Sequence, residues 1–241
     1  MANILDYLEW RGDLPFEASA FNEVDAVVFS RFSYIPFEGI VPDDFNHTVT
    51  VAEAAERFLG DAERMTQVIY EDDLKLLAAM GASRRFGDLR LCGYVNQLDE
   101  EIQKQFSAVT VKLFDDVSCV VYRGTDKTVV GWREDCNMAF LSPVPSQRTA
   151  VEYLRQAAEQ IAGTFLLCGH SKGGNLAIKI FFMNINLLFY ALYQDVIMHF
   201  LLQNNSYLLQ QVLQLLQYHI LSETWFHSGD NFLLSIWPVC V

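Results

Sequence analysis

The ten residues from Phe165 to Gly174 constrain the fold of this chain more than any other segment. They read Phe-Leu-Leu-Cys-Gly-His-Ser-Lys-Gly-Gly, so a short apolar run leads into three glycines that surround one serine. Four consecutive apolar residues favour a buried strand, and glycines favour a sharp reversal of the backbone because they lack an obstructing Cβ. The segment therefore predicts a strand, a tight turn at Ser171 and a following helix.

Apolar patterning predicts further strands and helices upstream of this turn. The strands are expected over short apolar or alternating runs: Phe86 to Val95, Ala108 to Phe114, Val117 to Tyr122 and Phe165 to Cys168, with Asp115-Asp116 as a turn. The helices are expected where end signals flank a helical pattern: Thr50 to Leu59, Glu71 to Met80 and Gln147 to Ile161.

Three end signals define these helices. Thr50 and Glu53 form a capping box, Gly81 is expected as a left-handed terminator, and Ser146 is expected as the cap of the last helix. Strand and helix then alternate around Ser171, which is the order of a mostly parallel sheet covered on both faces. The expected class is therefore α/β.

Gly169 to Gly173 also matches the pattern G-x-S-x-G. In that pattern a serine on a strained strand-to-helix turn acts as a nucleophile, and the N–H of the next residue, here Lys172, stabilises an oxyanion. The alternatives are a glycine-rich turn with a fortuitous serine, or a weak phosphate cradle. A P-loop is excluded because G-x-x-x-x-G-K-[ST] is absent.

A second segment, Val120 to Asp126, is an apolar strand that ends in Arg-Gly-Thr-Asp. An acyl-transfer site needs a second oxyanion donor from a loop that faces the nucleophile, and Thr125 offers both an N–H and a hydroxyl. The alternative is that Arg-Gly-Thr-Asp forms a turn with a side-chain cap.

Together, Tyr-Arg-Gly-Thr and the later Gly-His-Ser-x-Gly-Gly resemble the class-three lipase branch of the α/β-hydrolase superfamily. A closer resemblance, over about residues 1–178, is to a bacterial family of lipase-like proteins catalogued as a domain of unknown function. It is carried by four segments: Arg-Gly-Thr-Asp126, Gly-Trp-Arg-Glu-Asp135, Pro-Val-Pro-Ser-Gln147 and Gly-His-Ser-Lys-Gly-Gly-Asn-Leu-Ala177.

The resemblance implies an α/β-hydrolase-like three-layer sandwich with a mostly parallel sheet, incomplete or divergent at its C-terminus. It also implies Ser171 as nucleophile, with Thr125 and Lys172 as oxyanion residues. The resemblance carries no established substrate. For a hydrolase the expected substrate is a small-molecule or lipid ester, and no cofactor or metal is expected. His170 is expected as a packing neighbour, because a residue beside the nucleophile on a tight turn points away from it.

The composition changes abruptly at Lys179. All 17 lysines and arginines lie at or before it, and residues 180–241 hold one glycine among long Leu, Gln, Phe and Tyr stretches. We therefore divide the chain into an α/β-hydrolase-like domain over residues 1–179 and an atypical, helical apolar tail over residues 180–241. The tail is interpreted as out-of-frame translation or as a divergent replacement.

The tail also carries an apolar helical stripe, which includes Leu208, Val212, Leu215 and Leu216. Core packing, a partner helix and a membrane surface all explain such a stripe. The lack of lysine and arginine in the tail weakens the membrane-surface interpretation, because interfacial helices usually place cations on their polar face.

A serine hydrolase of this kind needs an acid and then a histidine after the nucleophile. The candidates all lie in the tail: Asp195, His199, His219, His227 and Asp230. Asp195 with His227 is the pair that best keeps the required order. Two hypotheses follow: a serine ester hydrolase related to lipases, or a catalytically inactive α/β-hydrolase-like binding protein without a complete triad.

Composition bounds the partners and the compartment. A net charge of −13 repels phosphate backbones, which argues against nucleic acid. Five scattered cysteines without a C-x-x-C pair fit reduced thiols in a cytoplasm. The longest apolar run, Leu187 to Tyr193, has seven residues where a membrane-spanning helix needs about 20, and the acidic first residues do not match a secretory signal.

Overall fold

The computed structural model describes residues 3–183 and 234–236. The chain divides into two compact units, Met1–Phe181 with Leu234–Val241, and Phe182–Leu233. All strands of the described residues belong to the first unit.

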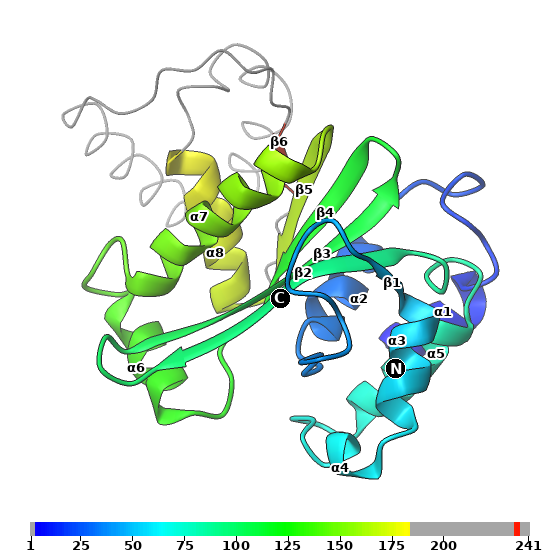
Figure 1. Cartoon of the computed structure of the whole chain (residues 1–241), viewed down its shortest axis with the longest axis horizontal. Helices are drawn as coiled ribbons and strands as arrows, with labels where there is room; N and C mark the ends of the chain where they lie inside the picture. The colour runs from blue at the N-terminus through cyan, green and yellow to red at the C-terminus, as the bar shows by residue number, and fades with distance from the viewer. Residues whose placement is uncertain (1–2, 184–233, 237–241) are drawn as a thin grey trace. The chain divides into compact units, whose positions relative to one another are not determined.

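The described elements follow one another along the chain as in Figure 1. The helices are α1 (Ile4–Arg11), α2 (Glu23–Phe32), α3 (Val51–Leu59), α4 (Ala62–Met65), α5 (Asp72–Ala82), α6 (Val129–Asn137), α7 (Pro145–Gln160) and α8 (Lys172–Met183). The strands are β1 (Val49–Thr50), β2 (Arg90–Asp99), β3 (Lys104–Phe114), β4 (Val117–Tyr122), β5 (Thr164–Gly169) and β6 (Leu234–Ile236).

The strands form one mixed sheet in the order β1-β2-β3-β4-β5-β6. The pairs β1–β2, β2–β3 and β3–β4 are antiparallel, whereas the pairs β4–β5 and β5–β6 are parallel. The predicted α/β-hydrolase-like sandwich with a mostly parallel sheet was therefore wrong. The reason is the length of the connections: the two-residue turn Asp115-Asp116 and residues 100–103 are too short for a parallel crossover, so they close antiparallel hairpins.

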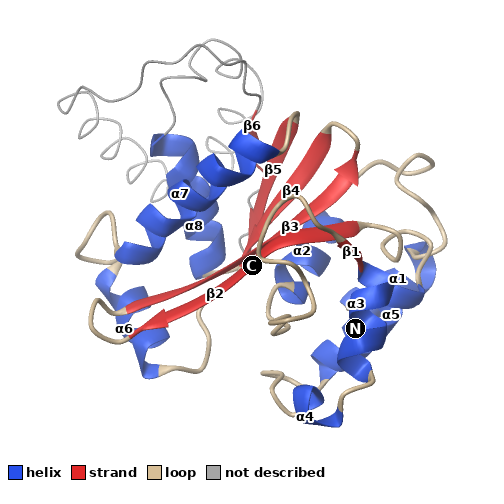
Figure 2. Cartoon of the chain, viewed as in Figure 1, coloured by secondary structure: helices blue, strands red, loops and turns tan. Residues whose placement is uncertain are grey.

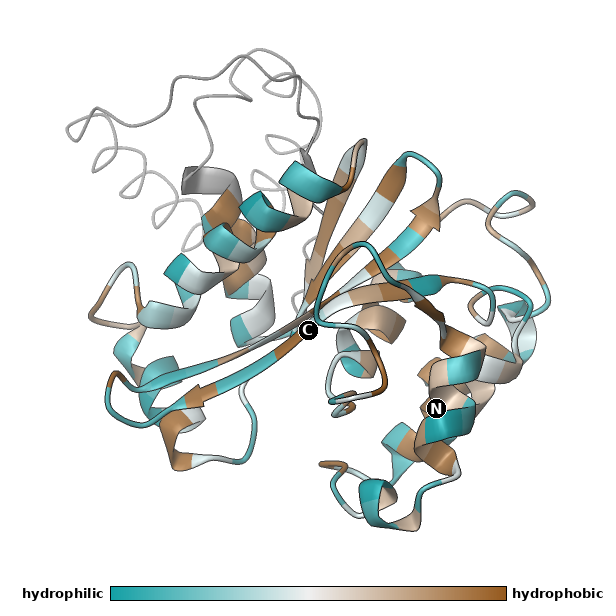
Figure 3. Cartoon of the chain, in the orientation of Figure 1, coloured by the Kyte–Doolittle hydropathy of each residue, from teal (hydrophilic) through white to brown (hydrophobic). Residues whose placement is uncertain are grey.

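Helices cover both faces of this sheet (Figure 2). Side chains that alternate along β3 and β4, such as Val111 and Cys119, join a core with α1, α2, α3 and α5. On the other face, the Tyr122 ring lies 6.2 Å from the ring of Tyr153 on α7, and its hydroxyl donates to the Ala150 carbonyl at 3.1 Å. Figure 3 shows apolar stretches along β4 and β5 between these helices.

The capping box at Thr50 and the strand at Val117–Tyr122 are confirmed. The expectation for Gly81 was wrong, because Gly81 lies inside α5. A Cβ there would lie 2.7 Å from the Cβ of Ala55, so this glycine lets α5 approach α3 closely. The cap of α7 was also misassigned: Pro145 begins the helix, and the N–H of Val144 donates to Gln147 Oε1 at 2.9 Å.

Within the described residues, no helix is long and apolar enough to cross a bilayer. In the same part of the chain, no three His, Cys, Asp or Glu side chains gather as metal ligands. The stripe from Leu208 to Leu216 lies outside the described residues, while Leu234–Ile236 of the tail pairs with β5 as β6.

Candidate active site

Ser171 occupies the turn between β5, which ends at Gly169, and α8, which begins at Lys172. Its backbone φ is 55°, in the left-handed region that L-residues other than glycine rarely adopt. Such a conformation costs about 1–3 kcal/mol and persists only where the surroundings enforce it. The side chain at the strained position is exposed, so the turn presents a hydroxyl to solvent.

The two glycines of G-x-S-x-G are required by close backbone contacts. A Cβ on Gly169 would lie 2.3 Å from the carbonyl carbon of Gly173. A Cβ on Gly173 would lie 2.1 Å from the carbonyl oxygen of Tyr122, at the end of β4. Only glycine fits at either position, and the turn is thereby pressed against the carboxyl end of the neighbouring strand.

The same contact brings the Thr125 segment beside Ser171. A Cβ on Gly124, the residue before Thr125, would lie 2.6 Å from the carbonyl oxygen of His170, the residue before Ser171. Ser171, Lys172 and Thr125, which the sequence predicted as one site, therefore lie on two segments that touch.

Two of the expected oxyanion donors are unused within the described residues. Lys172 is the first residue of α8, where a helix leaves its N–H groups unpaired and carries a partial positive charge. The Thr125 hydroxyl is buried and forms no hydrogen bond in the described part of the chain. An unpaired buried hydroxyl costs about 1–3 kcal/mol, so Thr125 is a costly residue at this position.

Asp126 gives the Arg-Gly-Thr-Asp segment a side-chain cap as well. Its Oδ1 accepts from the N–H of Thr128 at 2.9 Å and from the Thr128 hydroxyl at 2.5 Å. Arg123 is buried, donates to Asn96 Oδ1 at 2.7 Å and lies 3.5 Å from Asp126. The cap fixes the loop that carries Thr125. A capped turn and a loop that offers an oxyanion donor, the two interpretations of Arg-Gly-Thr-Asp, are therefore compatible.

Tyr34 contacts both halves of the site. Its hydroxyl lies 3.4 Å from Nδ1 of His170, and a Cβ on Gly124 would lie 2.2 Å from the same hydroxyl. Burial raises the pKa of Tyr34, which keeps the phenol neutral. Nothing in the local pattern around Tyr34 marked it, because the contact spans two distant parts of the sequence.

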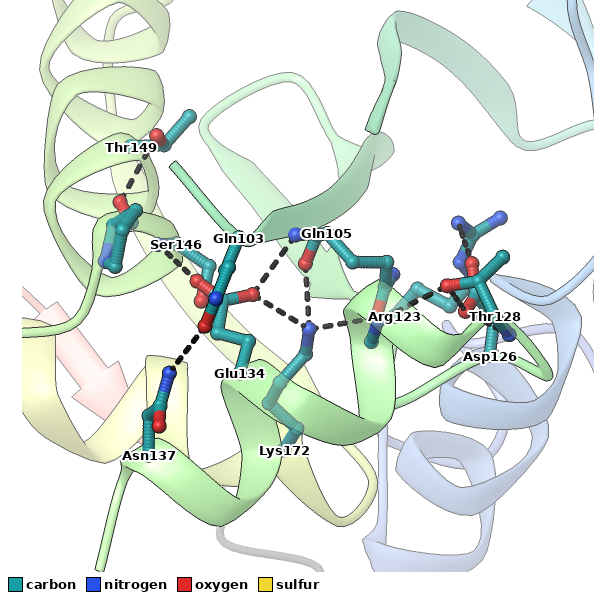
Figure 4. A network of polar contacts seen from close by, with 12 residues as sticks. Gln103, Gln105, Arg123, Asp126, Thr128, Glu134, Asn137, Ser146, Thr149 and Lys172 are labelled. Atoms are coloured by element: carbon teal, nitrogen blue, oxygen red, sulfur yellow. Dashed lines mark hydrogen bonds and ion pairs between the residues drawn. The ribbon is translucent and has the colours of Figure 1, made fainter. Parts of the chain in front are cut away.

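The Lys172 side chain is buried and points toward Gln105 and Glu134 (Figure 4). Its ammonium donates to the carbonyl and side-chain oxygens of Gln105 at 2.6 Å each and lies 3.1 Å from Oε2 of Glu134. Burial lowers the pKa of Lys172, and Glu134 opposes this shift. Sequence reasoning assigned Lys172 a role through its backbone alone and missed Glu134, although Gly-Trp-Arg-Glu-Asp135 was among the resembling segments.

The described residues contain two histidines, His47 and His170. His47 is exposed and bonded to Asp44, and His170 contacts Tyr34. No hydrogen bond joins the Ser171 hydroxyl to either. The other triad candidates, Asp195, His199, His219, His227 and Asp230, lie outside the described residues.

One family comparison gave a result. The sequence model of the Mbeg1-like family matches residues 80–217, a range that includes Thr125, Glu134 and Ser171 and runs across Lys179. No match was found among curated proteins or among solved structures.

Proposed function

The chain belongs to the Mbeg1-like family, and from the site at Ser171 we propose that it is a lipase-like or esterase-like serine hydrolase. The observation that carries this proposal is the left-handed φ of Ser171 between two glycines that admit no side chain. Such strain is typical of nucleophile turns. The substrate class is a carboxylic ester, either a small molecule or a lipid.

In the proposed reaction the Ser171 hydroxyl attacks the ester carbonyl carbon, and a base takes its proton. The carbonyl oxygen becomes an oxyanion that accepts hydrogen bonds from the N–H of Lys172 and from Thr125. Collapse expels the alcohol and leaves an acyl group on Ser171. Water then attacks the acyl-enzyme, releases the acid and restores the hydroxyl.

The acid and the base of this reaction are assigned to the tail. Asp195 with His227 keeps the order acid-then-histidine after the nucleophile, and His199, His219 and Asp230 are the remaining candidates. A second function, a catalytically inactive binding protein, is favoured by one observation: within the described residues Ser171 has no histidine partner.

Hydrolysis of p-nitrophenyl esters of short and long acyl chains tests the proposal. The full chain is expected to release p-nitrophenol, and Ser171→Ala is expected to lose the whole enzymatic rate, because no other group supplies the attacking oxygen. Ser19→Ala, a serine in the loop between α1 and α2, is the matched control and should retain the rate. Equal hydrolysis by the wild type and Ser171→Ala would refute the assignment, and a folded but inactive wild type would favour the binding protein.

A further inference from the structure

Lys172 and Glu134 form an ion pair whose side chains are both fully buried. All three N–H groups of the Lys172 ammonium have acceptors: the two oxygens of Gln105 and Oε2 of Glu134. The positive charge of Lys172, the residue after Ser171, is thus held at one fixed position in the protein interior.

The Glu134 carboxylate accepts from three donors on three elements. Oε2 accepts from the Lys172 ammonium at 3.1 Å and from the N–H of Gln105 on β3 at 2.9 Å. Oε1 accepts from the N–H of Ser146 at the start of α7 at 2.8 Å. Because every partner is a donor, only an acceptor-only carboxylate satisfies this position.

The pair connects the two segments that supply the proposed oxyanion donors. Lys172 follows Ser171 directly, and Glu134 lies on α6, which begins soon after Thr125. Gly131 on α6 packs against the loop of Thr125, since a Cβ there would lie 2.7 Å from Oδ1 of Asp126. Glu134 is therefore connected to the Thr125 loop through α6 and to the turn at Ser171 through Lys172.

A need for stability alone does not account well for such a pair. Removing two charges from water costs several kcal/mol per ion, and well-packed apolar residues often replace buried pairs without loss of stability. A charged pair that fixes geometry is retained for a different reason, because donors aimed at an oxyanion must be preorganised within fractions of an ångström.

We propose that Glu134 and the Lys172 side chain are positioning residues that hold the backbone N–H of Lys172 and the Thr125 loop at the spacing an oxyanion requires. This inference rests on the proposed hydrolase function. Glu134, the buried acid of Gly-Trp-Arg-Glu-Asp135, thereby belongs to the site although it does not contact the substrate.

The test uses the full chain and three variants: Lys172→Met, Glu134→Gln and the double variant Lys172→Met with Glu134→Gln, which removes both charges and keeps an acceptor oxygen for the buried N–H groups of Gln105 and Ser146. The matched control is Arg85→Met, which breaks the other fully buried pair of the described residues, Arg85 with Asp25. Two quantities are measured under conditions where each variant is folded: the second-order rate of labelling by a fluorophosphonate, and amide hydrogen exchange of residues 123–126 and 171–174.

The three variants are expected to label about a hundredfold more slowly than the wild type, as for loss of one oxyanion donor, and to exchange faster in both segments. Arg85→Met is expected to label at the wild-type rate per folded molecule. The double variant decides between roles: it should recover thermal stability relative to Lys172→Met but not recover the labelling rate. Recovery of both would show that the pair is merely structural.

Hydrogen exchange separates this inference from the proposed function. If the wild type is not labelled but both segments exchange faster in the variants, the hydrolase function is refuted. The inference that Glu134 and Lys172 position the two segments is then still supported. Unchanged exchange in the variants would refute the positioning role whether or not Ser171 is labelled.

Discussion

Gly124 packs against His170 so closely that a Cβ on Gly124 would lie 2.6 Å from the carbonyl oxygen of His170. Each of the two residues directly precedes a proposed functional residue, Thr125 or Ser171. The contact therefore sets how near the segment of Thr125 approaches Ser171. It leaves no room for a side chain, because the same Cβ would also lie 2.2 Å from the Tyr34 hydroxyl.

Gly124→Ala is expected to destabilise the protein by about 1–3 kcal/mol, the usual cost of overpacking, and to abolish most ester hydrolysis. One contact is to backbone, so the added methyl must separate the two segments. Urea unfolding gives the free energy of unfolding, and p-nitrophenyl ester hydrolysis gives the rate. Gly60→Ala is the control, since its Cβ would lie 3.0 Å from the nearest atom, the Glu56 carbonyl oxygen. Wild-type activity in Gly124→Ala would mean that the two segments need not touch.

Thr125→Val is expected to separate stability from activity. Valine keeps the shape and the N–H but removes a buried hydroxyl that has no partner within the described residues, so the free energy of unfolding should be unchanged or higher. If the hydroxyl donates to the oxyanion, kcat should fall about a hundredfold while KM changes little. A loss of stability with unchanged kcat would assign the hydroxyl a structural role.

Alkaline pH is expected to unfold the protein cooperatively. Burial raises the pKa of Tyr94, Tyr122 and Tyr153 above the ordinary tyrosine value. Above about pH 10 the unfolded chain loses these protons and the folded chain keeps them, so the free energy of unfolding falls by about 1 kcal/mol per pH unit for each tyrosine. Their contribution is intact below about pH 10 and is lost as pH rises toward the folded pKa values.

Urea titrations at several pH values measure this slope. Tyr122→Phe should reduce the slope by about 1 kcal/mol per pH unit, because it removes one proton that the folded chain keeps. Tyr70→Phe, at an exposed position, should leave it unchanged. A Tyr122→Phe slope equal to that of the wild type would show that Tyr122 does not contribute.

Thiol reactivity should distinguish the cysteines. Cys136 is exposed, whereas Cys92, Cys119 and Cys168 are buried. Burial raises the pKa of Cys92 to about 11, so at about pH 8 about one Cys92 in a thousand is thiolate. In a Cys240→Ser background, iodoacetamide should modify one thiol of the native protein, and Cys136→Ser should abolish that reaction. Modification of Cys92 in the folded protein would contradict the packing of β2.

Local sequence signals specified much of the fold. The capping box at Thr50, the strand Val117–Tyr122 and the turn at Ser171 depend on neighbouring residues, so pattern and spacing sufficed to predict them. Strand direction failed, although Asp115-Asp116 was recognised as a turn. The turn Asp115-Asp116 and residues 100–103 close two hairpins, which make β2, β3 and β4 antiparallel. The prediction of a parallel sheet gave more weight to the alternation of strands and helices elsewhere in the chain than to this turn.

The residues of the candidate site also fall into those that the local sequence marks and those that only distant contacts bring together. Ser171, Thr125 and the motif glycines could be predicted as candidates because local backbone shape marks them in the sequence. Tyr34 and Glu134 could not, because each contacts the Ser171 segment from a distant part of the chain. Lys172 shows both cases: its N–H at the start of α8 was expected, and the burial of its side chain against β3 was not.

Reaction of the full chain with a fluorophosphonate, followed by mass mapping of the modified peptide, tests whether Ser171 is the nucleophile. The hydrolase assignment predicts one adduct, on Ser171, and no adduct in Ser171→Ala at equal thermal stability. A folded wild type that carries no adduct, or an adduct that persists in Ser171→Ala, would contradict it.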